Sequence, residues 1–124
     1  TEYKATQALV HEALEARFGK GCVGFINGDE RLVVSSAAGT ETAIVLSRDA
    51  AAEDFNAGRT RFLISTEAGG EGIDLQERCA VLVHIDMPWN PMRLHQRVGR
   101  LNRYGQKRAV SVFLLRNPGT VEAR

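Results

Sequence analysis

Hydrophobic positions along the chain follow two different periods, and their alternation predicts an α/β fold. Apolar side chains at positions 5, 9, 10, 13, 14 and 18 recur with the helical period, so residues 6–18 are predicted to form an amphipathic helix that ends at two glycines. A second helix is predicted over residues 48–57. Its N-cap is Ser47, its inward side chains are Ala51, Ala52 and Phe55, and its stop is Gly58.

Short apolar runs between the helices predict buried strands. They lie at residues 22–26, 61–65, 80–85 and 109–115. The run at 80–85 is nearly continuous, as expected of a parallel strand that is buried on both faces. Residues 31–47 remain ambiguous, because two apolar runs flank the turn at 38–40 and fit either an antiparallel hairpin or an irregular excursion.

This succession of strands and helices with short links predicts one domain over residues 1–124. We expect a three-layer α/β/α architecture with a mostly parallel sheet. The first predicted element is a helix, whereas in such folds a helix normally follows a strand. We therefore expect that the first strand is missing from this sequence and that the sequence is a fragment of a longer protein.

The third predicted helix carries a row of arginines. Asn90 is its expected N-cap, Pro91 its first position and Gly105 its stop. Leu94, Val98 and Leu101 form an apolar stripe, and the arginines at 93, 97 and 100 repeat the same spacing on another face, with Arg103 one turn further on. Guanidinium groups are suited to bidentate contact with phosphate, although a basic helix face is often merely solvated.

The charge distribution along the chain supports a functional role for this row of arginines. The net charge is +1, but residues 87–121 hold seven Lys/Arg and no acid, whereas residues 1–86 hold eight Lys/Arg and fourteen Asp/Glu, a net of −6. The basic third therefore needs an anionic partner or an acidic face of its own protein.

Glycines at 69, 70 and 72 follow the strand at 61–65. They allow close approach of a ligand or positive φ, although a plain flexible turn is an alternative. Because ligands of parallel sheets lie beyond the carboxyl ends of the strands, this turn and the arginine helix together form a plausible anion site. The sequence contains neither a P-loop, G-x-x-x-x-G-K-[ST], nor a G-x-G-x-x-G fingerprint.

Other classes of site and location are disfavoured. The three histidines lack metal-ligand spacing, so no metal site is expected, and Cys22 and Cys79 are interpreted as buried thiols of a reducing compartment. No apolar run approaches the roughly 20 residues that span a membrane, so no membrane partner is expected.

Two segments resemble known motifs. Ser-Thr-Glu-Ala-Gly-Gly-Glu-Gly-Ile-Asp-Leu-Gln at 65–76 resembles motif V of superfamily-two helicases, and Gln-Arg-Val-Gly-Arg-Leu-Asn-Arg-Tyr-Gly-Gln at 96–106 resembles their motif VI. Residues 86–91 and the ending Arg-x-Gly-Gln look most like the Swi/Snf-type DNA translocases and their bacterial relatives, and the opening Thr-Glu-Tyr-Lys-Ala-Thr is similar to the tail of motif IV. The resemblance covers nearly the whole chain and implies the C-terminal RecA-like domain of such a motor.

That resemblance also implies roles for individual residues. Arg100 and Arg103 would be catalytic arginine fingers on the γ-phosphate of ATP, which is held with Mg²⁺ mainly by the first lobe. Nucleotide-binding positions would be Gly72, Asp74, Gln96 and Arg97; nucleic-acid-binding positions would be Thr66, Ala68, Gly69 and Gly70. Trp89 and Asn90 would be mostly structural.

The resemblance implies two partners, the N-terminal RecA-like lobe and double-stranded DNA. It also implies a cytoplasmic location, nucleoid-associated in a bacterium. The domain alone is expected to be inactive as an ATPase. Residues 29–47 and the triplet Asn102-Arg103-Tyr104 depart from the family pattern, so nucleosome substrates are not implied. The alternatives are a lobe of an RNA- or DNA-unwinding helicase, a non-catalytic nucleic-acid or protein scaffold and, less favoured, a small-molecule phosphate enzyme.

Overall fold

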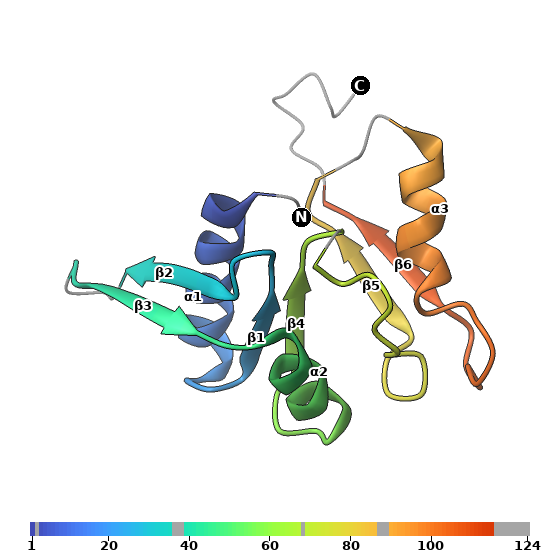
Figure 1. Ribbon diagram of the computed structural model, residues 1–124, viewed down its shortest axis with the longest axis horizontal. Coiled ribbons are helices and arrows are strands. Elements are labelled where there is room, and N and C mark those ends of the chain that lie inside the picture. The colour runs from blue at the N-terminus through green and yellow to red at the C-terminus, as the bar shows by residue number, and fades with distance from the viewer. Residues whose placement is uncertain (2, 36–38, 68, 87–89, 116–124) are drawn as a thin grey trace.

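The computed structural model describes residues 1, 3–35, 39–67, 69–86 and 90–115. The predicted Ala68 contact and Trp89 lie outside these residues. Within them the elements follow in the order α1 (Lys4–Phe18), β1 (Val23–Ile26), β2 (Arg31–Ser35), β3 (Glu41–Val45), α2 (Arg48–Asn56), β4 (Phe62–Ser65), β5 (Val81–His84), α3 (Pro91–Gly99) and β6 (Ser111–Leu114) (Figure 1).

Two parallel strands, β1 and β4, form the best-covered part of the sheet, in a register that pairs Val23 with Phe62. Because side chains alternate across a strand, β1 contributes to two cores. Phe25 packs with Ile64 beneath α1, whereas Ile26 packs with Ala51 of α2. The two helices therefore cover opposite faces, and the predicted three-layer α/β/α order is confirmed here.

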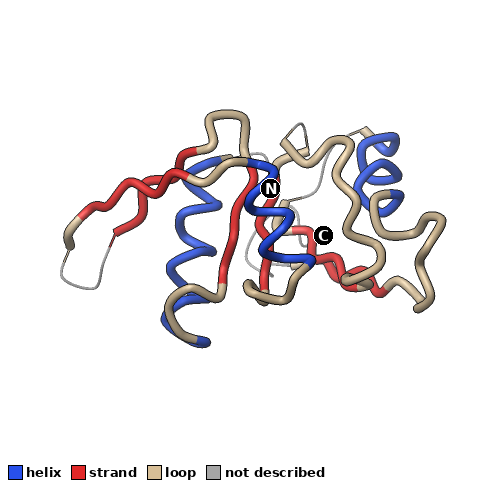
Figure 2. The backbone as a smooth tube through the Cα atoms, turned by 60° about the horizontal axis from the view of Figure 1, so that its bottom comes forward, coloured by secondary structure: helices blue, strands red, loops and turns tan. Residues whose placement is uncertain are grey.

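The ambiguous segment after β1 is an antiparallel hairpin of β2 and β3. It projects from the rest of the domain (Figures 1 and 2). Leu32 is fully buried in the core beneath α1, and Val34 and Ile44 pack against the same core. These three side chains share the face that packs on the domain, whereas Val33 and Val45 are exposed, so the inward-facing residues fix the hairpin to the domain.

The second parallel pair, β5 and β6, is less buried than the sequence predicts. Side chains of Val81 and Val83 are 54% and 43% exposed, whereas His84 is buried. The prediction of a strand covered on both faces is therefore wrong, because one face of β5 lacks a covering layer among the described residues. The paired strands also form three separate two-stranded ladders, and β4 and β5 are not hydrogen-bonded to each other in the described chain.

The helix α1 buries only part of the predicted apolar stripe, since Val10 and Leu14 pack against the core. Leu9 is 67% exposed, whereas Gln7 is fully buried. The Gln7 amide Nε2 donates to the carbonyls of Ile26 (3.1 Å) and Ile64 (3.3 Å), and its Oε1 accepts from Asn27 Nδ2 (3.1 Å). A polar side chain thus satisfies carbonyls near the carboxyl ends of β1 and β4, which apolar periodicity does not reveal.

The arginine helix α3 is shorter than predicted. It begins as expected, since the Asn90 side chain accepts from the amide of Met92 (2.9 Å) and Pro91 follows the cap, but it ends at Gly99 rather than near Gly105. Tight turns follow, in which the amides of Leu101 and Asn102 both donate to the carbonyl of Val98. Arg100 and Arg103 therefore leave the helical face on which the sequence places them.

Cys22 and Cys79 are free thiols as expected, but they are partly buried rather than buried. Within the described ranges, α1, α2 and α3 are all too short or too polar to cross a bilayer.

Candidate functional site

The glycine turn after β4, the carboxyl end of β5 and the helix α3 meet at one edge of the domain (Figure 1). β4 ends at Ser65 and β5 ends at His84, and α3 supplies arginines that reach back to both connections. This is the predicted edge, and the predicted neighbours do lie together there.

Two glycines of the turn are required by close packing. A Cβ on Gly69 would lie 2.6 Å from Thr66 Oγ1 and 3.1 Å from Asn27 Cα, and a Cβ on Gly70 would lie 2.5 Å from Ser65 Oγ. The Thr66 hydroxyl accepts from the Gly69 amide (3.0 Å), and the Gly70 amide donates to the Thr66 carbonyl (3.1 Å). The turn is therefore built against the ends of β1 and β4 rather than being a plain flexible link.

The third glycine of the turn is required by its backbone conformation rather than by close packing. Gly72 has φ +79°, the left-handed region that favours glycine, and a Cβ there would lie 3.4 Å from a terminal nitrogen of Arg48. The Arg48 guanidinium also donates to the carbonyl of Glu71. The turn thereby brings a further arginine, from α2, to the same edge.

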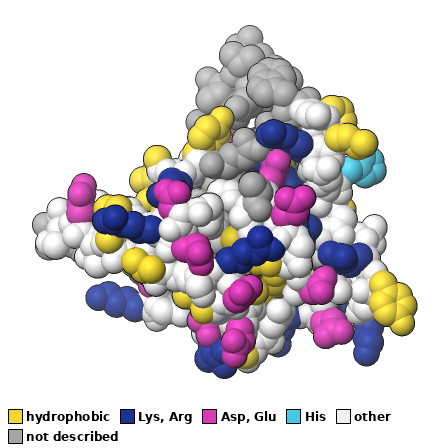
Figure 3. All heavy atoms as spheres, viewed as in Figure 1, with side chains coloured by type: hydrophobic (Ala, Val, Ile, Leu, Met, Phe, Trp, Pro, Cys, Tyr) yellow, Lys and Arg dark blue, Asp and Glu magenta, His cyan; other side chains and the backbone are white. Residues whose placement is uncertain are grey.

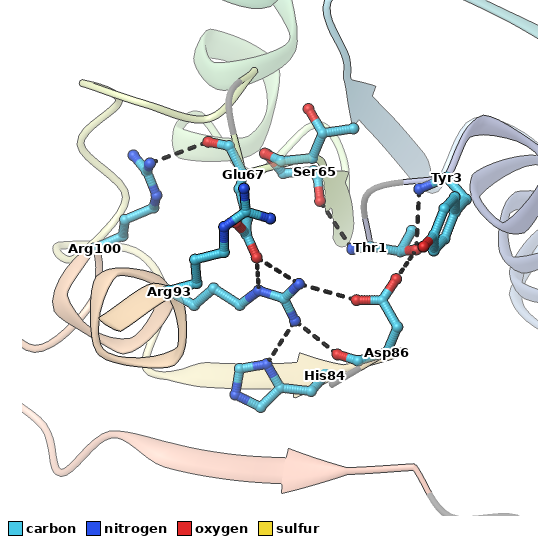
Figure 4. Close-up of polar contacts among 10 residues, drawn as sticks. Thr1, Tyr3, Ser65, Glu67, His84, Asp86, Arg93 and Arg100 are labelled. Atoms are coloured by element: carbon cyan, nitrogen blue, oxygen red, sulfur yellow. Dashed lines mark hydrogen bonds and ion pairs between the residues drawn. The ribbon is translucent and has the colours of Figure 1, made fainter. Parts of the chain in front are cut away.

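Arg97 lies at the centre of a buried polar network. Its guanidinium donates to Glu67 Oε1 (2.7 Å from Nε), to Asp86 Oδ1 (2.9 Å) and to the Asp86 carbonyl (2.7 Å). It also contacts His84 Nδ1 at 3.1 Å. Figure 4 shows Glu67, Asp86 and His84 pointing toward one another. Arg97 is only 9% exposed, so this network ties the connection after β4 to the end of β5.

The protonation state of His84 follows from this contact. Burial, and next the positive charge of Arg97, lower the pKa of His84 from its usual 6.5. A neutral ring with an unprotonated Nδ1 accepts from Arg97, which places the ring proton on Nε2. That Nε2 is buried, without a hydrogen-bond partner among the described residues.

Arg100 makes contacts of another kind. Its two terminal nitrogens donate to the backbone carbonyls of Gly70 and Glu67, the latter at 3.1 Å. Burial lowers the pKa of Arg100, Arg48 and Arg103 also lower it, and Glu71 raises it. The partners are neutral carbonyls, and in the described part of the chain no ion pair to Arg100 is found, so its positive charge is held without a direct counter-ion.

Arg103 lies nearby at the surface. Its guanidinium forms an ion pair with Asp74 at 3.4 Å, and the two side chains are 43% and 72% exposed. Such exposed pairs contribute about 0–1 kcal/mol, so the guanidinium can exchange this partner for a stronger anion at little cost. Gln96 is exposed on α3, outside the Arg97 network.

The sequence leaves open whether the basic third pairs with an anionic partner or with acidic residues of its own protein, and ion pairs within the domain answer this in part. The basic third finds acidic partners from residues 1–86, namely Glu67 for Arg93 and Arg97, Asp86 for Arg97, and Asp74 for Arg103. Acidic and basic side chains also lie interspersed on the face shown in Figure 3. Sequence reasoning did not assign Glu67, Asp86 or His84 to the site, although a buried arginine needs such partners.

Comparisons with known proteins agree with these motifs. Residues 46–105 match the model of the helicase conserved C-terminal domain. The chain is 38% identical over 122 residues to the uncharacterized ATP-dependent helicase YqhH of Bacillus subtilis, covering 98% of this chain and 19% of that protein. It is 42% identical over 80 residues to the human SWI/SNF-related matrix-associated actin-dependent regulator of chromatin subfamily A member 1, covering 62% of this chain and 8% of that protein.

A solved structure is similar in fold. The C-terminal part of the Fun30 ATPase domain superposes with a TM-score of 0.73 at 18% identity, covering 98% of this chain and 34% of that one. At this identity the likeness concerns the fold alone. The chain spans about a fifth or less of the two curated relatives' lengths.

Proposed function

This chain belongs to the family of helicase conserved C-terminal domains of Swi/Snf-type ATP-dependent helicases, with a RecA-like fold, and from this premise we propose that it is the second motor lobe of an ATP-driven translocase on double-stranded DNA. In this proposal a first RecA-like lobe holds ATP and Mg²⁺. The present domain closes over that lobe and supplies arginines to the transferred phosphoryl group.

The observation that supports this proposal best is the state of Arg100. A half-buried guanidinium bound to two neutral carbonyls, near Arg48 and Arg103, gives a concentrated positive field without a direct carboxylate partner among the described residues. An arrangement of this kind is pre-organised for charge that develops on phosphoryl oxygens. Arg103 is suited to the same role because its ion pair with Asp74 is exposed and weak.

Arg97 has a supporting role in the proposal. Its donor positions are already occupied by Glu67, Asp86 and His84. It holds the glycine turn against the end of β5, and through that turn it fixes the carbonyls that orient Arg100. A direct contact of Arg97, Gln96, Gly72 or Asp74 with nucleotide stays a prediction from the resemblance.

The proposed DNA contacts lie on the same turn. Thr66, Gly69 and Gly70 are the described positions that the resemblance implies for a nucleic-acid phosphate. Their backbone is braced by the Thr66 hydroxyl, and that turn also carries the acceptors for Arg100. A change at the nucleotide would therefore reach the DNA through one short segment, which is the coupling a translocase requires. Binding to phosphates should weaken as salt rises.

The test is ATP hydrolysis by the complete protein that carries both lobes. Arg100→Ala and Arg103→Ala are each expected to lower DNA-stimulated kcat by about a hundredfold or more, because an arginine finger contributes about 10³–10⁵ in related phosphoryl transfers. Arg59→Ala is the matched control, since Arg59 is also an exposed arginine paired with an aspartate, Asp54 at 2.7 Å, but lies before β4.

The outcomes separate the alternatives. Full ATPase activity in Arg100→Ala would favour the non-catalytic scaffold. Loss of activity in Arg100→Ala together with strand separation by the wild-type protein would favour an unwinding helicase. Movement on duplex DNA without strand separation, measured by displacement of a bound third strand, is the result expected here.

A further inference from the structure

The link between α3 and β6 carries an aromatic side chain that lies almost wholly in water. Tyr104 is 99% exposed, the highest value among the exposed large apolar side chains of the described residues. Single exposed apolar residues are ordinary on protein surfaces, so exposure by itself indicates no function. What distinguishes Tyr104 is its position, because it directly follows Arg103, one of the two arginines assigned to the transferred phosphoryl group.

The backbone around Tyr104 is fixed by hydrogen bonds. The Tyr104 carbonyl accepts from Gln76 Nε2 at 3.2 Å, and the amide of Gln106 donates to the Arg103 carbonyl at 3.0 Å. The Gln106 side chain also donates to the carbonyl of Cys79 at 2.9 Å, just before β5. A tyrosine ring on a fixed backbone can rotate only about two side-chain bonds, so a ligand that contacts it loses little affinity to ordering of the protein.

The link lies along the segment that follows β4 and matches it in order. Three contacts follow one another from the carboxyl end of β4 toward the amino end of β5: Arg100 with the carbonyls of Glu67 and Gly70, Arg103 with Asp74, and Tyr104 with Gln76. In Figure 1 the link, drawn in orange, reaches the end of the sheet at which β6 begins, opposite the carboxyl ends of the strands. The residues proposed for DNA therefore lie at one end of this row and Tyr104 lies at the other.

We propose that Tyr104 binds the base of the ATP molecule that the first lobe holds, by stacking its ring on one face of the base. This inference rests on the proposed function, in which the γ-phosphate lies at Arg100 and Arg103. Because DNA contacts the end of the row marked by Thr66, the rest of the nucleotide extends from the γ-phosphate toward the opposite end. That end is where Tyr104 lies.

The base is the part of ATP whose chemistry suits this side chain. Phosphate groups are matched by guanidinium donors, whereas Tyr104 offers a flat and largely apolar ring, and aromatic rings bind bases by stacking. The base touches this lobe only when the two lobes close on the nucleotide. The contact therefore strengthens binding of ATP and ADP and takes no part in breaking the phosphate bond, so its loss should appear in KM rather than in kcat.

The first experiment measures DNA-stimulated ATP hydrolysis by the complete protein with both lobes. Tyr104→Ala should raise KM for ATP by about fivefold or more, with kcat changed by about twofold at most, because stacking of one base on an aromatic ring has an effect of this size. Tyr104→Phe keeps the ring and should keep the KM of the wild-type protein. Leu9→Ala is the matched surface control, since Leu9 is 67% exposed and lies on α1.

The second experiment uses two competitive inhibitors to test whether the ring contacts the base. ADP carries the base, whereas inorganic tripolyphosphate does not. Tyr104→Ala should weaken inhibition by ADP by about fivefold or more and leave inhibition by tripolyphosphate unchanged. An equal loss for both inhibitors would overturn the proposal in favour of a contact between Tyr104 and the first lobe. Unchanged inhibition by ADP would overturn it as well, as would Tyr104→Phe being impaired as much as Tyr104→Ala.

Failure of this inference can be told apart from failure of the proposed function. If Arg100→Ala lowers kcat while Tyr104→Ala leaves both KM and inhibition by ADP unchanged, only the assignment of Tyr104 is overturned. Full ATPase activity in Arg100→Ala would instead overturn the proposed function, and this inference with it.

Discussion

Arg97→Ala is the substitution that most directly probes how the two halves of the site are held together. It removes one side chain that donates to Glu67, to Asp86 and to His84. Two carboxylates then remain close to one another without the cation between them. The connection after β4 and the end of β5 should therefore open independently of the rest of the domain.

The magnitude follows from burial. Removing one partner from a buried ion pair costs about 3–5 kcal/mol. The side chains of Glu67 and Asp86 retain 20% and 25% exposure, so water can solvate them in part after the change. We therefore expect a loss of about 2–3 kcal/mol in the local opening free energy, which corresponds to about 30- to 150-fold faster amide exchange.

The assay is hydrogen exchange of peptides that contain residues 65–70 and 81–86, in the complete protein. Arg97→Lys should recover part of the protection, because a single ammonium cannot reproduce the planar donor pattern. Arg59→Ala, an exposed ion-paired arginine, should change exchange by no more than about twofold. Exchange in Arg97→Ala that is as slow as in Arg59→Ala would refute the network's structural role.

Three further predictions concern stability. The pKa of His84 is lowered in the folded protein, so the unfolded chain binds a proton at His84 more readily. The free energy of unfolding should therefore fall as pH drops below about 6.5. His84→Gln should flatten this pH dependence in urea unfolding measured from pH 5.5 to 7.5. Gly69→Ala forces a Cβ against backbone and should cost about 1–3 kcal/mol, whereas Gly28→Ala, with open space at its Cβ, should be much milder, as compared by thermal unfolding. Gln7→Leu leaves the Asn27 amide without its buried acceptor and should cost about 1–3 kcal/mol in the same measurement.

The sequence predicts the elements of this fold well where local signals are strong. The caps Ser47 and Asn90 both accept from backbone amides as expected, since a cap depends on residues one turn away. Tertiary contacts account for the predictions that are wrong. The end of α3 is moved to Gly99 by turns that bury Leu101, and the predicted apolar stripe of α1 is only partly buried because Gln7 is held by strand carbonyls.

The candidate site can likewise be predicted from the sequence only in part. The glycines and arginines lie at the expected edge, because the order of strands in a parallel sheet brings their carboxyl ends together. Which arginine is buried cannot be read from spacing, since Arg93, Arg97 and Arg100 repeat with one period. Only the positions of Glu67 and Asp86 in space separate a structural arginine, Arg97, from one whose charge has neutral partners, Arg100.

The proposed function depends above all on Arg100 reaching a phosphate that is held by another lobe. The most direct measurement is a structure of the complete protein bound to DNA, with ADP and aluminium fluoride as a mimic of the transferred phosphoryl group. We expect the Arg100 guanidinium within hydrogen-bonding distance of the fluoride ligands, with Arg97 still bound to Glu67 and Asp86. A closed complex in which Arg100 stays on the carbonyls of Glu67 and Gly70, remote from the aluminium fluoride, would contradict it.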